Sequence, residues 1–181
     1  LYILFAVIVS VFGKLYSLLM LYAKRMYPAI RQPEYIKLLG LLGMAYIISL
    51  TVTDLTGGGE QFLMQQAEGG NNNIYWIAGM MFLHMVFTVF SFSSGLPGGS
   101  FIPTLVTGGL TGKLYALILV QHGIVRMESV SYVMLIGMGA FLVAVVRTPI
   151  TAIILITEIT GHFEVFYPSI VVGGLTYYFT E

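Results

Sequence analysis

Long apolar stretches separated by short polar breaks make up most of this chain. Leu1–Tyr27, Tyr35–Val52, Ile74–Ser93 and Phe101–Val120 are apolar with few charges, and about 20 such residues suffice to cross a bilayer as a helix. The first stretch is long enough for one tilted helix. The pattern therefore predicts an all-α protein built from membrane-spanning helices.

The remaining apolar stretches are too short for a full crossing. Ser131–Val145 and Pro149–Thr160 are separated by Arg147-Thr148-Pro149, which predicts two partial helices that meet inside the protein. Tyr167–Thr180 predicts a last, incomplete span, and a short helix is expected over Gln61–Ala67. Broken segments of this kind are typical of transporters whose site lies near the bilayer midplane.

The composition indicates the same class of protein. The chain is 57% hydrophobic and 9% charged, whereas about a quarter of the residues in a soluble domain are charged. Eight Lys and Arg residues balance eight Asp and Glu residues, so the net charge gives no indication of a nucleic-acid partner. Cysteine is absent, which excludes disulfides and thiolate sites. We expect an integral membrane protein in the plasma (inner) membrane of a prokaryote.

Basic residues and the chain ends indicate topology and context. Half of the basic residues surround one short loop, which the positive-inside tendency places in the cytoplasm: Lys24, Arg25, Arg31 and Lys37. Asp54–Glu60 is expected to turn at the opposite face. Because Leu1 and Glu181 both lie in apolar stretches, we expect the chain to be one piece of a longer membrane protein.

A glycine-rich break at Ser94–Pro103 separates the apolar stretch Ile74–Ser93 from the one that follows it. In hydrocarbon an unpaired amide costs several kcal/mol, so irregular backbone survives there only if protein buries it or if it lines a polar path. Pro103 is favoured in the first turn of a helix, because its missing N–H would be unpaired there anyway. The break therefore predicts a helix N-terminus at membrane depth.

A helix N-terminus attracts an anion without any basic side chain, because it has unpaired amides and about half a positive charge from the aligned peptide dipoles. The N–H groups of Ser100, Phe101 and Ile102 are predicted to face the anion, and Gly98 and Gly99 permit the positive φ values and the close approach that such a site needs. Partial charges of this kind hold an ion and still release it.

The same glycines allow a second interpretation. Small residues commonly let membrane helices pack closely, so the chain could be a membrane scaffold or a partner-binding domain without a transport role. The spacing of the residues alone leaves both interpretations open.

Several motifs resemble those of the CLC chloride channel and transporter family, in the same order. Gly98–Pro103 (GGSFIP) resembles the GxFxP motif, and Phe92–Gly99 resembles the CFSSGxPGG-type sequence that precedes it. Further matches to the GMGA, RxPLT and LEMT segments are found at Gly137–Ala140, Arg147–Thr151 and Glu158–Thr160. The resemblance covers essentially residues 1–181 and implies the second half of an inverted-repeat CLC-type membrane domain with tilted and broken helices.

The resemblance also implies a function and a site. It implies chloride transport, with the backbone of the GxFxP motif binding the anion, which corresponds here to Gly99, Ser100, Phe101, Ile102 and Pro103. It further implies a homodimer with its contact at about 149–181. The family's serine motif and its two functional glutamates belong to the first half of the domain, and its anion-coordinating tyrosine follows Glu181. The residues of this chain are consistent with both a passive channel and a proton-coupled exchanger.

The other ionisable residues give weaker indications of function. Glu158 is expected to be a paired structural carboxylate, and Arg147 is expected to bond loose carbonyl groups at a helix break. His84, His122 and His162 are scattered and lack the further ligands of a metal site. We predict no metal, no cofactor and, since no nucleophile and base stand at workable spacing, no enzyme.

Overall fold

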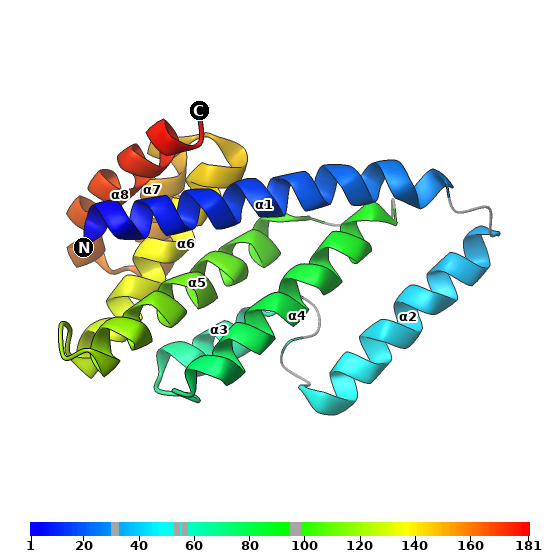
Figure 1. The fold of residues 1–181 in the computed structure, drawn as a ribbon, viewed down its shortest axis with the longest axis horizontal. Coiled ribbons are helices and arrows are strands. Elements are labelled where there is room, and N and C mark those ends of the chain that lie inside the picture. The colour runs from blue at the N-terminus through cyan, green and yellow to red at the C-terminus, as the bar shows by residue number, and fades with distance from the viewer. Residues whose placement is uncertain (30–32, 53–54, 56–57, 95–98) are drawn as a thin grey trace.

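The computed structural model of the chain describes residues 1–29, 33–52, 55, 58–94 and 99–181, and every regular element in these residues is helical (Figure 1). The helices are α1 (Tyr2–Ala29), α2 (Glu34–Thr51), α3 (Glu60–Ala67), α4 (Ile74–Ser93), α5 (Phe101–Gln121), α6 (Val130–Val146), α7 (Pro149–Thr160) and α8 (Phe166–Phe179), with single 3₁₀ turns η2 (Met127–Ser129) and η3 (Phe163–Val165). Each predicted helix is present, with ends that differ by at most two residues.

One predicted length was wrong. The segment expected over Ser131–Val145 was considered too short for a crossing, but η2 continues directly into α6, and Met127–Val146 is 20 residues long. The sequence pattern missed this because Glu128 and Ser129 look like loop residues, although polar residues fit the first turn of a helix. Arg147 ends α6 in the left-handed region with φ 62°, and α7 begins at Pro149.

Helices α5 and α6 form the most extensive helix pair of the fold and cross at a seam of glycines. A Cβ atom on Gly112 would lie 2.5 Å from the Val133 carbonyl oxygen, and one on Gly108 would lie 2.7 Å from the Gly137 carbonyl oxygen. Gly137 approaches the backbone of α5 equally closely. The two backbones therefore touch, as small residues allow in membrane helix pairs.

The long helix α1 lies along α8 and α6 and reaches across α4, whereas α2 stands at the far side of the molecule with little packing (Figure 1). Gly13 of α1 fits against Ala144 of α6 so closely that a Cβ atom would overlap its methyl group. Tyr16 of α1 is fully buried, with its ring edge-to-face on Phe141 at 5.6 Å between centroids.

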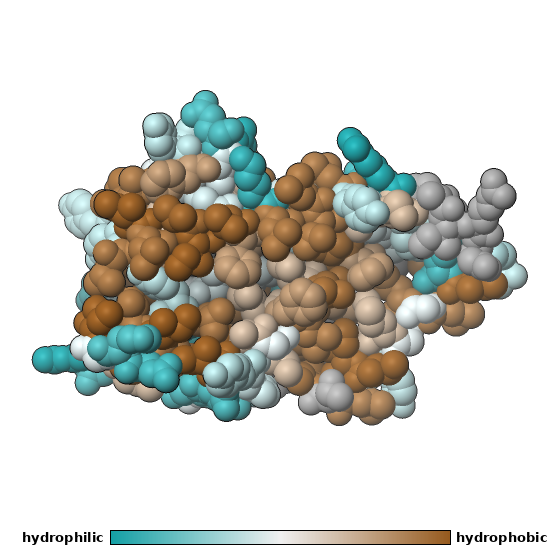
Figure 2. Space-filling model, in the orientation of Figure 1, coloured by the Kyte–Doolittle hydropathy of each residue, from teal (hydrophilic) through white to brown (hydrophobic). Residues whose placement is uncertain are grey.

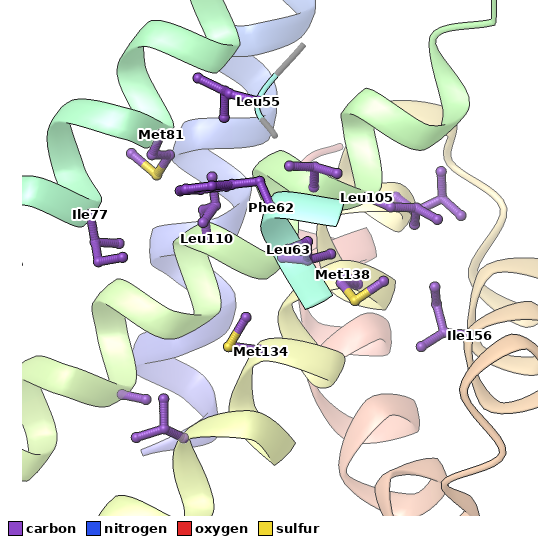
Figure 3. Packing of buried hydrophobic residues seen from close by; sticks show 14 of the residues in the cluster. Leu55, Phe62, Leu63, Ile77, Met81, Leu105, Leu110, Met134, Met138 and Ile156 are labelled. Atoms are coloured by element: carbon purple, nitrogen blue, oxygen red, sulfur yellow. The ribbon is translucent and has the colours of Figure 1, made fainter. Parts of the chain in front are cut away.

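The short helix α3 fills the space between α4, α5 and α6. Its Phe62 and Leu63 lie among Leu110 of α5 and Met138 of α6 (Figure 3). The backbone end of α3 is bound by side chains from the core helices: Ser131 Oγ donates to the Ala67 carbonyl at 2.7 Å. A helix this short gains its stability from such packing and capping rather than from its own hydrogen bonds.

The outer surface is apolar over the middle of the molecule. In Figure 2 a brown band crosses the face shown, with teal residues gathered at its upper and lower edges. Of the described helices, α1, α4, α5 and the continuous η2–α6 segment are long and apolar enough to cross a membrane, whereas the apolar stretches Tyr35–Leu50 and Pro149–Thr160 are shorter. The chain is an all-α integral membrane protein.

Candidate functional site

The first turn of α5 has the predicted form of an open helix N-terminus. Ser100 is the N-cap, and its side chain makes no capping hydrogen bond. Its carbonyl accepts the first intrahelical bond from the Thr104 N–H at 3.1 Å and a second bond from the Thr104 hydroxyl at 2.6 Å. The first N–H groups of a helix have no intrahelical acceptor, and Pro103 has no N–H, so the donors here belong to Ser100, Phe101 and Ile102.

These donors lie where α5 leaves the packed interior. Phe101 is 39% exposed and Ile102 is 41% exposed. Thr104 and Leu105, which follow in the same turn, are buried. Gly99 is also exposed, whereas Ser100 and Pro103 are half-buried. The structure thus places Gly99 to Pro103 at a partly exposed edge before the buried part of the helix.

Gly99 is exposed directly before the first turn of α5. A Cβ atom on Gly99 would meet nothing within 4 Å among the described residues. Gly98 lies outside the described residues, as do the preceding residues of the break from Gly95 to Pro97.

The positive potential at this edge comes from the backbone. Lys113 is the sole charged residue of α5, and it lies 12 positions after Phe101, about 18 Å along the helix axis. Lys113 is completely buried, and its ammonium group donates to the carbonyl and to the side-chain oxygen of Gln66, each at 2.8 Å. Because Gln66 lies in the last turn of α3, this cation is held by the negative end of another helix.

His84, which the sequence presented only as one of three scattered histidines, lies near the start of α5. His84 of α4 is 1% exposed, and its two ring nitrogens lie close to Gly58 and to Thr107 in the second turn of α5. Gly58 in turn lies against Ile102. No spacing signal in the sequence relates these residues, since they come from three separate segments.

The other ionisable residues that the sequence singled out lie elsewhere. Arg147 donates to the Thr180 carbonyl, as expected for an arginine at a helix break. Glu158 is exposed on α7, and its expected pairing stays a prediction. His122 ends α5 on the exposed surface, and His162 lies at the edge of the Tyr132 ring. Among the described residues no three His, Asp or Glu side chains gather as metal ligands.

Two predicted loop features fall partly outside the described residues. These are Arg31 in the basic loop and Asp54, Thr56 and Gly57 in the turn before α3. Gly59, at the end of that turn, has φ 77° and caps the start of α3.

The chain is similar to known proteins over nearly its whole length. Residues 1–181 match the family model described as voltage gated chloride channel. The chain is 29% identical over 175 residues to the H(+)/Cl(-) exchange transporter ClcA of Klebsiella pneumoniae, covering 94% of the chain and 37% of that protein. It is 31% identical over 179 residues to ClcA of Yersinia pestis, covering 94% of the chain and 36% of that protein. The chain thus spans little more than a third of these relatives.

The fold also matches a solved structure. The crystal structure of a slow cyanobacterial Cl-/H+ antiporter superposes with a TM-score of 0.85 and 21% sequence identity, over 99% of this chain and 42% of that one. The arrangement of tilted, broken helices is therefore one that a known membrane transporter adopts.

Proposed function

The chain belongs to the voltage-gated chloride channel family, and from this premise we propose that it is part of a membrane protein that transports chloride past the first turn of α5. The observation that carries the proposal is the open helix start, where the N–H groups of Ser100, Phe101 and Ile102 lie at an exposed edge without a capping side chain. The motif Gly99–Pro103 forms this edge.

Such an edge suits a transported anion better than a stored one. Three amides and the helix dipole replace part of the hydration shell of chloride. A lysine in direct contact with the ion would add a full positive charge and slow the release of chloride. The lysine of α5, Lys113, lies about 18 Å away along the helix axis, where it donates to Gln66 of α3. The site can therefore bind an ion and let it go.

We further propose that residues 1–181 are the C-terminal half of the transmembrane domain of a longer protein, which supplies the remaining anion ligands. The exposed first turn of α5 supports this, because Phe101 and Ile102 would be covered only partly by the described chain. The relatives are bacterial proteins, which supports a place in the plasma (inner) membrane of a prokaryote.

A homodimer contact through about 149–181 is part of the same proposal. The outer faces of α7 and α8 carry large apolar side chains that the chain itself leaves exposed: Ile150, Ile154, Ile159, Tyr167, Ile170 and Tyr178. A second copy of this face is a suitable cover for such a surface.

The test is anion flux from liposomes that contain the full-length protein. Phe101→Ala removes the side chain at the centre of the open edge, and we expect it to change the chloride rate or the chloride-over-nitrate ratio about ten-fold, since hydrogen bonds to a charged group depend strongly on geometry. Phe82→Ala on α4 is the matched control, because Phe82 is 61% exposed and lies outside the motif. Equal flux and selectivity in the two variants would contradict the proposal.

A further inference from the structure

The hydroxyl of Tyr16 is a buried polar group beside the first turn of α5. Tyr16 of α1 is fully buried, with its ring edge-to-face on Phe141 of α6. Among the described residues no group forms a hydrogen bond of ordinary geometry with its hydroxyl, which lies beside the Thr104 side chain. A buried hydroxyl that gives up its bonds to water without a new partner destabilises a fold. Because phenylalanine would fill the same space without this cost, packing alone does not account for a tyrosine here.

The Thr104 hydroxyl has a defined direction. It donates its proton to the Ser100 carbonyl at 2.6 Å, so its oxygen is left as an acceptor toward Tyr16. The phenol O–H of Tyr16 is a donor of the matching kind. The three groups are therefore arranged for a series in which Tyr16 donates to Thr104 and Thr104 donates to Ser100.

The Ser100 carbonyl belongs to the same peptide group as the Phe101 N–H. A peptide group is planar and trans, so its C=O and its N–H point in opposite directions. The N–H and the hydroxyl of Thr104 both bond to this carbonyl, at 3.1 and 2.6 Å, and hold it toward the body of the helix. The Phe101 N–H is thereby directed outward, to the exposed edge. Hydrogen bonds at the carbonyl also polarise the N–H of the same group, which strengthens it as a donor.

This peptide group is the first in α5 that the helix itself secures. The preceding carbonyl, that of Gly99, would pair in a regular helix with the N–H of residue 103. Residue 103 is proline and has no N–H. The orientation of the Phe101 N–H therefore depends on the bonds to the Ser100 carbonyl, and the shorter of the two comes from the Thr104 hydroxyl.

A threonine two turns later makes the same backbone contact without the same consequence. The Thr111 hydroxyl donates to the Thr107 carbonyl at 2.7 Å, a bond that threonines in helices often make to the carbonyl four residues earlier. The N–H of that peptide group belongs to Gly108, which lies inside the helix and has an intrahelical acceptor. At Thr104, in contrast, the peptide group ends in an N–H at the open start of the helix.

We propose that Tyr16 and Thr104 are positioning residues for the anion site: their hydroxyls act in series on the Ser100 carbonyl and hold the Phe101 N–H toward the ion. The proposal rests on the proposed function of the α5 start. Tyr16 is fully buried and Thr104 is 2% exposed, so water does not compete for either hydroxyl. The two side chains act through the peptide group and do not contact the ion.

The first test compares Thr104→Val with Thr111→Val in liposomes that contain the full-length protein. Both variants remove one buried hydroxyl from α5 and keep a branched side chain. We expect Thr104→Val to raise the KM for chloride about five-fold, as the loss of one hydrogen bond to the site allows. The maximal rate should change little, because a loss of binding alone raises KM at constant kcat. Thr111→Val should follow the wild type, and Thr104→Ser, which keeps the hydroxyl, should restore the wild-type KM.

The second test removes the outer hydroxyl of the series with Tyr16→Phe. We expect the KM for chloride to rise about two-fold. The double variant with Thr104→Val should have the KM of Thr104→Val alone, since residues that act through one another are not additive. Tyr115→Phe is the matched control, because Tyr115 of α5 is also buried and its hydroxyl donates to the Leu1 carbonyl of the α1 segment at 2.9 Å. It should leave the KM unchanged.

The outcomes separate this proposal from the proposed function. Equal KM values for Thr104→Val and Thr111→Val would overturn the role of the two hydroxyls. Independent, additive effects of Tyr16→Phe and Thr104→Val would overturn the series between them. Both results leave chloride transport by the wild type intact, whereas absence of any chloride flux from the wild type would refute the proposed function instead.

Discussion

Glycines serve opposite purposes in two regions of α5. In the seam with α6, a Cβ atom on Gly108, Gly112 or Gly137 would lie within 2.7 Å of a backbone oxygen of the facing helix. At Gly99, just before the same helix, a Cβ atom would meet nothing within 4 Å among the described residues. The seam glycines allow the two helix backbones to touch, whereas Gly99 leaves space beside the first N–H groups of α5.

This difference separates the two interpretations that the sequence left open. Helix packing accounts for the seam glycines, as a scaffold would require. It does not account for Gly99, which packs against no described residue and directly precedes the uncapped helix start at Ser100 and Phe101. Close packing thus explains the glycines of the seam, and the proposed anion access concerns a different turn at the start of the helix.

The largest effect is expected from Gly112→Ala in the seam. Its Cβ atom would lie 2.5 Å from the Val133 carbonyl oxygen and 2.9 Å from the Met134 Cα atom, and backbone cannot move aside as a side chain can. We expect a loss of about 3 kcal/mol or more in stability, at the upper end for overpacked cores. The measurement is the melting temperature and the monodisperse fraction of the full-length protein in detergent. A melting temperature equal to that of the wild type would show that the seam is not close-packed.

A smaller effect is expected from Gly109→Ala on the neighbouring face of α5. Here the new methyl group would meet the ends of flexible side chains, at 2.6 Å from Leu63 Cδ1 and 3.2 Å from Met138 Cγ. We expect a loss of about 1 kcal/mol, because these side chains can shift. Melting temperatures of Gly109→Ala, Leu63→Val and the double variant check this: the double variant should recover part of the loss, since contacting residues are not additive. If the losses of the two single variants simply added in the double variant, the strain would not lie in the contact between residue 109 and Leu63.

The helices were predictable because their signals are local. Runs of apolar residues of sufficient length and proline in the first turns of α5 and α7 predict helices from the local sequence, and the structure has helices there. The family was predictable for a related reason, because its motifs are short and stand in a fixed order along the chain.

The surroundings of the site were not predictable, because they depend on contacts between distant segments. His84 meets Gly58 and Thr107 only after α4 and α5 pack together. The burial of Lys113 likewise depends on the end of α3, where the carbonyl of Gln66 accepts from its ammonium group. Periodicity and motif spacing along one segment contain no information about contacts between distant segments.

The smallest effect on stability, and the clearest contrast with Gly112, is expected from Gly99→Ala. A Cβ atom on Gly99 would meet no described residue within 4 Å, so the change in stability should stay within about 0.5 kcal/mol. The methyl group would nevertheless stand beside the donors of Ser100 and Phe101, and we expect the KM for chloride to rise about ten-fold, because small displacements at a binding centre are costly.

Gly79→Ala on α4 is the matched control, since a Cβ atom on Gly79 also meets nothing within 4 Å. It should leave both the melting temperature and the KM unchanged. If Gly99→Ala melted as early as Gly112→Ala, Gly99 would be a packing residue like those of the seam, and the scaffold interpretation would extend to the whole of α5. A normal melting temperature with a raised KM would favour use of the space beside Gly99 by the ion, because no described residue packs into that space.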